Sequence, residues 1–345
     1  MKIMVFGDIH FHNAHHFSTI TSEGYTVREL EHLECAKVLT DLYESKKIDK
    51  VVCLGDLWSP VGDTISAQTT SALVEFFARL RDKIPSIDVL VGNHDLILNH
   101  QSEIHKLACI KYIPGIHLYE TGTEVGDFIY MPYYTDDEKA TKFLQNIENK
   151  QNKIIFSHLE LGNIDLGNGI VTQHGVSLDL LRNFKMTLQG HYHSGGNYGH
   201  KIQIAGSTQR LSFKDRGIAR KNIIIYDTEL DKIERESFNS PDWLTFDDEN
   251  IENILNVDNN NYVKVELTTD ILLTDKIKAK LEQFKGKYVH IDLTRISVNK
   301  KVNSDVNNSE DNVEIIRQFV NKSENSEEQK EQLIKEGIRL LDKTK

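Results

Sequence analysis

The sequence predicts a layered α/β domain over residues 1–235, because two kinds of segment alternate there. Short apolar runs are typical of buried strands, and longer segments with apolar residues at helical spacing are typical of amphipathic helices. Their alternation is typical of domains in which helices cover a β-sheet. The predicted strands are Ile3–Phe6, Val51–Leu54, Val89–Val91, Ile154–Phe156, the weaker Met186–Leu188, and Asn222–Tyr226.

Two helices are predicted from apolar residues that recur every three or four positions. The first is Arg28–Ser45, whose apolar positions are Leu30, Leu33, Val38, Leu39 and Leu42. The second is Ser66–Arg81, whose apolar positions are Leu73, Val74, Phe77 and Leu80. Each helix lies between two predicted strands, as a layered α/β domain requires.

A second, smaller unit is predicted after the main domain. Residues 236–261 are polar and contain Ser-Pro and Asn runs, which predicts a linker. Residues 262–300 then predict a strand, a helix and a strand. These elements are Tyr262–Leu267, Thr274–Phe284 and Tyr288–Leu293.

The C-terminal part predicts a tether followed by a helical pair. Residues 301–312 are rich in Asn, Ser and Asp without apolar periodicity, which predicts a flexible tether. Residues 313–345 contain two short amphipathic segments, with apolar faces at Val313, Ile316, Phe319, Val320 and at Leu333, Ile334, Ile338, Leu341. Two such helices bury little apolar surface alone, so they either fold back on the core or dock on a partner, and we favour the partner.

Five polar motifs follow the predicted strands of the main domain. They are Asp8-Ile9-His10, Gly55-Asp56, Gly92-Asn93-His94-Asp95, His158, and Gly190-His191-Tyr192-His193. Side chains at the ends of successive strands converge on one edge of a sheet. A single Asp-x-His is a weak signal, but all five motifs in order are a specific one.

Carboxylates and imidazoles in this arrangement predict a site for two metal ions. Two divalent ions about 3.5–4 Å apart acidify a water molecule and clamp the oxygens of a phosphate. A bridge between them needs a carboxylate, and we assign Asp56 because its motif stands between the two ligand groups in chain order. Asp8, His10 and His193 complete one metal, and Asn93, His158 and His191 complete the other. Mixed imidazole and carboxylate ligands suit Mn, Fe or Zn.

Two further residues of the third motif lie beside this ligand set. His94 directly follows Asn93, so it is expected next to the metals without being a ligand. There it would protonate the leaving oxygen or stabilise charge in the transition state. Asp95 is expected to orient a neighbour, which the sequence does not identify.

With these motifs the chain resembles the calcineurin-like metallophosphoesterase superfamily, and within it the SbcD-type DNA nucleases, including recombination nuclease subunits of large bacteriophages. The resemblance covers roughly residues 1–235 and includes the Gly-Ser segment at residues 206–213. It implies a four-layer fold of two packed β-sheets flanked by helices. It also implies that Asp56 bridges the metals and that His94 is catalytic.

The resemblance further implies Mn-dependent cleavage of DNA, with 3′-to-5′ exonuclease action on duplex DNA, in end processing, recombination and repair. Residues 262–300 resemble a small α/β capping domain that positions DNA, and a C-terminal subdomain that only braces the core is an equal alternative. Residues 313–345 resemble a helical pair that binds an SMC-like SbcC-type ATPase, and helices of the N-terminal half would form a homodimer. Ser59 stands where many of these nucleases have a histidine, which bears on the endonuclease mode and leaves the metal ligands intact.

The charge distribution adds a local argument for nucleic acid. The net charge is −11, but residues 201–221 carry six basic groups against one acidic group. Phosphate contacts by Lys and Arg dominate affinity for DNA. We therefore assign Arg210, Lys214 and Arg216 to DNA binding.

Composition bounds the class of protein. The content is 39% hydrophobic and 27% charged, and no run of about 18 apolar residues exists, so a soluble protein without a membrane span is expected. The N-terminus enters a motif at once, so we expect no cleaved leader and a cytoplasmic protein, in the host cytoplasm if phage-encoded. Cys35, Cys53 and Cys109 are expected to be reduced and structural.

Two alternatives remain open from the sequence. The first is a phosphatase or small-molecule phosphodiesterase that uses the same metals, although such substrates need neither a tether nor a tail. The second is a scaffold without activity, which the complete ligand set and His94 argue against. Of the four histidines in the loop His10–His16, only His10 belongs to a motif, and the others are expected to be exposed.

Overall fold

The computed structural model describes residues 1–12, 18–59, 66–97, 104–164, 171–213, 222–268, 273–284, 287–292, 330–331 and 334–335. The chain divides into two compact units. The first comprises Met1–Thr245, Val257–Lys264 and Leu281–Val289, and it contains all five motifs. The second comprises Phe246–Asn256, Val265–Lys280 and His290–Lys345.

Two six-stranded sheets form the centre of the first unit. The first sheet has the order β14-β13-β1-β2-β3-β4, in which β1 to β4 are parallel and β13 and β14 are antiparallel. Its strands are β1 (Lys2–Phe6), β2 (Lys50–Cys53), β3 (Ile87–Leu90), β4 (Ile116–Tyr119), β13 (Asn222–Asp227) and β14 (Lys232–Ser237).

The second sheet has the order β11-β12-β10-β7-β6-β5, in which β12, β10, β7 and β6 are parallel. Its strands are β5 (Thr123–Val125), β6 (Phe128–Met131), β7 (Ile154–Ser157), β10 (Met186–Gln189), β11 (Gly196–Asn197) and β12 (Ile202–Ile204). A separate two-stranded sheet pairs β8 (Leu161–Gly162) with β9 (Val176–Ser177).

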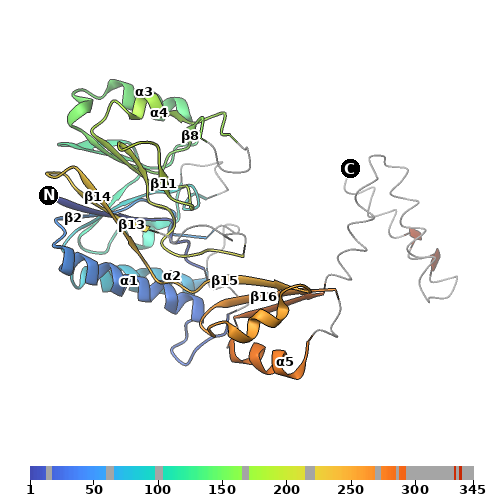
Figure 1. The fold of residues 1–345 in the computed structure, drawn as a ribbon. Coiled ribbons are helices and arrows are strands. Elements are labelled where there is room, and N and C mark those ends of the chain that lie inside the picture. The colour runs from blue at the N-terminus through green and yellow to red at the C-terminus, as the bar shows by residue number, and fades with distance from the viewer. Residues whose placement is uncertain are drawn as a thin grey trace. The chain divides into compact units, whose positions relative to one another are not determined.

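Helices cover the outer faces of the two sheets (Figure 1). α1 (Val27–Lys46) and α2 (Ala67–Arg81) pack on the first sheet, and α3 (Asp137–Asn146) and α4 (Leu178–Leu181) pack on the second. The short 3-10 helices are η1 (Leu107–Cys109) and η2 (Lys150–Asn152). The predicted four-layer fold is therefore confirmed.

The layers follow from the alternation of side chains along each strand. In β1, Ile3 and Val5 face the second sheet and join the core between the sheets, while Met4 and Phe6 pack under α1 and α2. The core between the sheets also holds a polar link, in which the Tyr130 hydroxyl donates to Asp88 at 2.6 Å.

Both predicted helices begin directly after an N-cap residue whose side chain accepts a hydrogen bond from the first turn. Thr26 caps α1, and its hydroxyl accepts from the backbone N–H of Glu29 while the Glu29 carboxylate accepts from the backbone N–H of Thr26. Ser66 caps α2 by accepting from the backbone N–H of Thr69. None of the helices in the described residues is long and apolar enough to cross a membrane.

A three-stranded sheet follows, with the order β15-β16-β17. Its elements are β15 (Trp243–Asp247), η3 (Ile251–Asn256), β16 (Tyr262–Leu267), α5 (Asp275–Leu281), η5 (Glu282–Phe284) and β17 (Tyr288–Asp292). The strand, helix and strand predicted in residues 262–300 are thus present, while residues 236–261, the expected linker, contain β15 and η3. The expected tether, residues 301–312, lies outside the described residues, as do residues 313–345 except Lys330, Glu331, Ile334 and Lys335.

Candidate metal centre

The predicted ligands lie at the carboxyl ends of five parallel strands, drawn from both sheets. Asp8 follows β1, Asp56 follows β2 and Asn93 follows β3 in the first sheet. His158 directly follows β7, and His191 follows β10, in the second sheet. Because the two sheets pack face to face, the ends of these strands bring the five side chains to one place.

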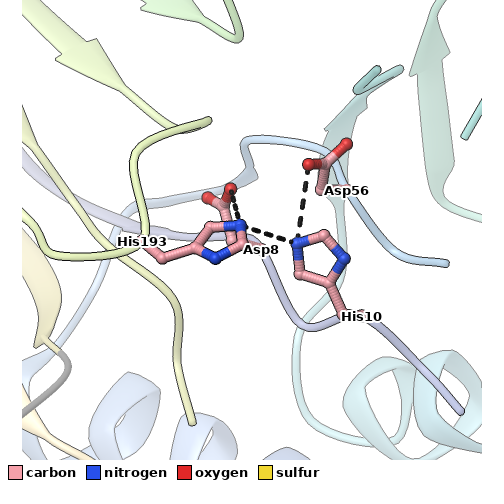
Figure 2. Close-up of side chains that lie close together, drawn as sticks. All are labelled: Asp8, His10, Asp56 and His193. Carbon is pink, nitrogen blue, oxygen red and sulfur yellow. Dashed lines mark hydrogen bonds and ion pairs between the residues drawn. The ribbon is translucent and has the colours of Figure 1, made fainter. Parts of the chain in front are cut away.

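Two groups of donor atoms form there, and they share one carboxylate. The first group is Asp8, His10, Asp56 and His193, and the second is Asp56, His158 and His191. In each group the donor atoms lie within 4.8 Å of one another. Figure 2 shows the first group, with the imidazoles of His10 and His193 between the two carboxylates.

Asn93 joins the second group through its amide. This amide lies 2.9 Å from Nε2 of His158 and 2.9 Å from Nδ1 of His191. The structure therefore brings together all seven residues that the sequence assigned as ligands, in the same two sets.

The backbone at these residues is strained. Asp8, His10, Asp56 and His191 have φ values of 51°, 53°, 52° and 70°, in the left-handed region that non-glycine residues rarely adopt. They are four of the eight non-glycine residues with positive φ in the described part of the chain. Strain of this kind persists where the surroundings over-determine the geometry, and it gathers at functional sites.

In two of the histidines, a hydrogen bond to a backbone carbonyl determines which ring nitrogen is left to face the candidate metal centre. Nδ1 of His10 donates to the carbonyl of Trp58 at 3.1 Å, and Nδ1 of His158 donates to the carbonyl of Leu54 at 2.7 Å. In a neutral imidazole this leaves the lone pair on Nε2, which faces the centre in both residues. Metal-binding histidines commonly have such an outer partner.

The donor set contains more acceptors than protein donors can satisfy, which is what a site for cations requires. Both carboxylate oxygens of Asp8 are buried, and among the described residues no group donates a hydrogen bond to them within the usual distance. Nε2 of His10 lies 3.0 Å from Nε2 of His193 and 3.5 Å from Asp56. Carboxylate oxygens, imidazole nitrogens and an amide oxygen together suit a divalent transition metal.

Burial and neighbouring charge shift the pKa values of two of these groups upward. Burial raises the pKa of Asp8 to about 7, and the neighbouring Asp56 carboxylate adds to the rise. Burial acts to lower the pKa of His158, but the charge of Asp56 outweighs it and raises that pKa to about 9.

His94 lies beside the donors without belonging to either group. Its Nε2 is 3.9 Å from Asp56, its ring packs edge-on against that of His10 at 4.8 Å, and its side chain is 25% exposed. Its backbone N–H donates to Oδ1 of Asp56 at 2.8 Å. An imidazole at the solvent-facing side of the centre is placed to reach a bound substrate.

Asp95 has the role that the sequence left open. Its fully buried carboxylate accepts from the backbone N–H groups of Asp56, Leu57, Trp58 and Gly92, at 3.0, 2.9, 3.1 and 2.8 Å. It therefore joins the Gly92–Asp95 turn to the loop that carries Asp56. The motif singled out Asp95, but its partners could not be predicted, because backbone N–H groups are present in almost every residue type.

The residues assigned to DNA binding are only partly described. Arg210 pairs with Asp242 at 3.1 Å, and its carbonyl accepts from the guanidinium of Arg28. Lys214 and Arg216 lie outside the described residues. His12, expected to be exposed, is instead half-buried because it packs against Arg28 and His32; His15 and His16 lie outside the described residues.

Comparison with known proteins identifies the class. Residues 1–198 match the calcineurin-like phosphoesterase family, and the chain belongs to this family. Membership, together with the two donor groups, makes the chain a metal-dependent phosphoester hydrolase.

Individual relatives are more distant. The chain is 22% identical to exonuclease subunit 1 of Enterobacteria phage T4 over 240 residues, which are 68% of this chain and 67% of that protein. Among solved structures it is similar to an archaeal phosphodiesterase, with 11% identity, a TM-score of 0.34, and coverage of 69% of this chain and 100% of the other. A phosphoesterase from E. coli is similar at 12% identity and a TM-score of 0.32, over 69% of this chain and 100% of the other.

Proposed function

We propose that this chain is the nuclease subunit of a DNA-processing enzyme, with two Mn²⁺ ions as its resident metals. One ion would be held by Asp8, His10, Asp56 and His193, and the other by Asp56, Asn93, His158 and His191. The observation that carries this proposal is the sharing of Asp56 between two donor groups that otherwise have no member in common. A bridging carboxylate is what a binuclear phosphodiesterase centre needs.

Different residues of this chain would have different roles in the reaction. The bound metals supply Lewis acidity and an activated water molecule at neutral pH. Asp56 holds the centre together, and the carbonyls of Trp58 and Leu54 keep Nε2 of His10 and His158 aimed inward. His94 would donate a proton to the leaving oxygen, for which its partial exposure beside Asp56 is suitable.

DNA as the substrate is supported by two observations. The relative from phage T4 is named as an exonuclease subunit, and its similarity extends over 240 residues. The basic residues at 201–221 follow the last motif and would contact the phosphate backbone. From these we propose exonuclease and endonuclease action in DNA end processing, recombination and repair, in the cytoplasm, which is that of the host if the protein is phage-encoded.

A partner is proposed for the C-terminal segment. The paired amphipathic patterns of residues 313–345 support docking on an SMC-like SbcC-type ATPase, and we also propose a homodimer. Deletion of residues 313–345 should abolish co-purification with the ATPase while Mn-dependent cleavage by the core is retained. Co-purification of the truncated chain at wild-type yield would exclude this role of the segment.

The substrate assay decides between DNA and small esters. The purified chain with Mn²⁺ should degrade labelled duplex DNA, and its turnover of p-nitrophenyl phosphate and cyclic nucleotides should be slower. Robust turnover of the small esters with no cleavage of DNA would reject the nuclease in favour of a phosphatase or small-molecule phosphodiesterase. Absence of any turnover by a metal-loaded protein would indicate a scaffold.

A further inference from the structure

A cavity of about 470 Å³ lies against the turn that carries Asn93 and His94. Its walls include Val91 and Leu96, which flank the turn Gly92–Asp95 on either side. A third wall residue, Tyr133, packs its ring against His191 with the ring centres 6.0 Å apart. The cavity is therefore next to the candidate metal centre through residues that flank or contact its ligands, although none of the seven proposed ligands lines it.

Three tyrosines, Tyr112, Tyr133 and Tyr134, contribute to the lining of this cavity. The Tyr134 hydroxyl accepts from the backbone N–H of Gly122 at 2.7 Å, and the backbone N–H of Tyr133 donates to the carbonyl of Val91 at 2.8 Å, so both residues are anchored. Tyr112 is different, because it lines the cavity while 85% of its surface is exposed to solvent.

The lining also includes polar groups of both signs of charge. The ammonium of Lys111 and Nε2 of His105 both lie near Oε1 of Glu120, at 2.9 and 2.8 Å. These three residues, with Thr121 and Thr135, offer hydrogen-bond donors and acceptors around the aromatic walls. A flat, polar-edged heterocycle fits such a lining better than an aliphatic group does.

We infer that this cavity is a subsite for one nucleobase of the strand whose phosphate lies at the metal centre. The inference rests on the proposed function, since it names where a nucleotide next to the scissile phosphate is held. Tyr112 supplies the stacking surface, and Lys111, His105 and Glu120 contact the edge of the base. Aromatic stacking tolerates all four bases, which suits a nuclease that digests any sequence.

A second copy of this chain is a weaker occupant for the same place. Stable dimers bury about 800 Å² on each subunit with an apolar centre. Among the described residues that line this cavity, the large exposed apolar side chains are Ile104 and Tyr112. A concave pocket with aromatic and apolar walls and a few polar groups is the form expected of a ligand site.

The test compares esters with and without a base. Thymidine 5′- and 3′-(p-nitrophenyl phosphate) each carry a base, and methyl p-nitrophenyl phosphate has the same leaving group without one. With Mn²⁺, Tyr112→Ala should lower kcat/KM for at least one thymidine ester about tenfold and leave the methyl ester within about twofold. Tyr112→Phe keeps the ring and should restore the value. Leu230→Ala, which truncates a residue that is 72% exposed elsewhere, is the control.

Each other outcome has a distinct meaning. Equal losses on all three esters, or no loss on any of them, would overturn the base subsite while cleavage of duplex DNA by the wild type still supports the nuclease. A wild type that hydrolyses the methyl ester but neither thymidine esters nor DNA would instead overturn the proposed function. A shift from dimer to monomer in sedimentation of Tyr112→Ala would assign the cavity to a second copy and reject the subsite.

Discussion

Asp95 accepts a hydrogen bond from the backbone N–H of Asp56 at 3.0 Å. The buried carboxylate of Asp95 therefore holds the loop that carries the carboxylate of Asp56. The two oxygens of Asp95 together accept four backbone N–H groups. This bonding keeps Asp56 at φ 52° with its side chain aimed at both donor groups. The candidate centre therefore depends on a residue that does not belong to it.

Replacement of Asp95 tests this dependence. Asp95→Asn keeps the volume but turns an N–H₂ group toward two backbone donors, so the free energy of unfolding should fall by roughly 2–4 kcal/mol. Affinity for Mn²⁺ should fall as well, because the Asp56 loop is released. Urea unfolding and isothermal titration with Mn²⁺ measure the two effects.

The matched control for Asp95→Asn is Asp88→Asn. Asp88 is also buried and lies in β3, which leads to the same turn, but it pairs with Lys50 and Tyr130 between the sheets. That variant should lose stability without losing Mn²⁺ affinity. Equal metal affinities in all three proteins would show that Asp95 does not position the centre.

Gly92 is predicted to tolerate no side chain. A Cβ at Gly92 would lie 2.2 Å from Oδ1 of Asp56 and 2.3 Å from its backbone nitrogen, so Gly92→Ala must displace the shared carboxylate. We expect Mn²⁺ affinity and phosphodiesterase activity to fall at least tenfold, as titration and turnover of methyl p-nitrophenyl phosphate would show. Gly24→Ala, where a Cβ meets nothing within 4 Å, should cost stability alone. Full activity in Gly92→Ala would refute the observed packing of this turn.

His94 is expected to act on turnover and not on metal binding. His94→Ala should lower kcat about 10²- to 10⁴-fold, as removal of a general acid does, while Mn²⁺ affinity stays near that of the wild type. His200→Ala removes an exposed histidine that pairs with Asp231 and serves as the control. Equal kcat in His94→Ala and wild type would remove His94 from the mechanism.

A pH effect on stability is expected from His32, which is buried under Phe11. Burial lowers the pKa of His32 well below its usual 6.5, and the charge of Arg28 and the nearby His12 and His10 lower it further. Below about pH 6.5 the unfolded chain therefore binds a proton that the folded chain does not, and stability falls as the pH falls.

The size of this effect can be isolated with one variant. In EDTA, the wild type should lose about 1.4 kcal/mol more per pH unit than His32→Gln between about pH 6 and pH 5. Urea unfolding at a series of pH values measures the difference. Parallel stability curves for the two proteins would contradict the assignment to His32.

The elements that could be predicted from the sequence are those with a clear apolar pattern or a capping residue at the helix start. The runs that became β1, β2, β3 and β7 are apolar on both faces, because each strand is covered on both sides. The weaker run that became β10 is apolar on one face only, since Thr187 is a buried polar residue on the other. Strands such as β14 gave no signal, since Lys232–Ser237 is a polar edge strand with no buried residue among the six. Edge strands are held by pairing with a neighbour, and that pairing depends on residues distant in sequence.

The candidate site was predictable to the extent that side-chain chemistry defines it. Ligand types and their order along the chain located all seven proposed ligands. The expectation that they share one edge of one sheet was wrong, because β1, β2 and β3 belong to one sheet and β7 and β10 to the other, and the packing of the two sheets brings the strand ends together. The groups that orient them were not predictable, because Trp58 and Leu54 contribute backbone carbonyls, which every residue has. The left-handed φ at Asp8 and Asp56 likewise depends on the surrounding packing.

The central claim is that Asp56 joins two metal ions, and anomalous diffraction at the manganese edge tests it most directly. Crystals grown with Mn²⁺ should show two peaks about 3.5–4 Å apart, one beside His10 and His193 and one beside His158 and His191, with Asp56 between them. A single peak, or peaks remote from Asp56, would contradict the shared carboxylate and with it the binuclear centre.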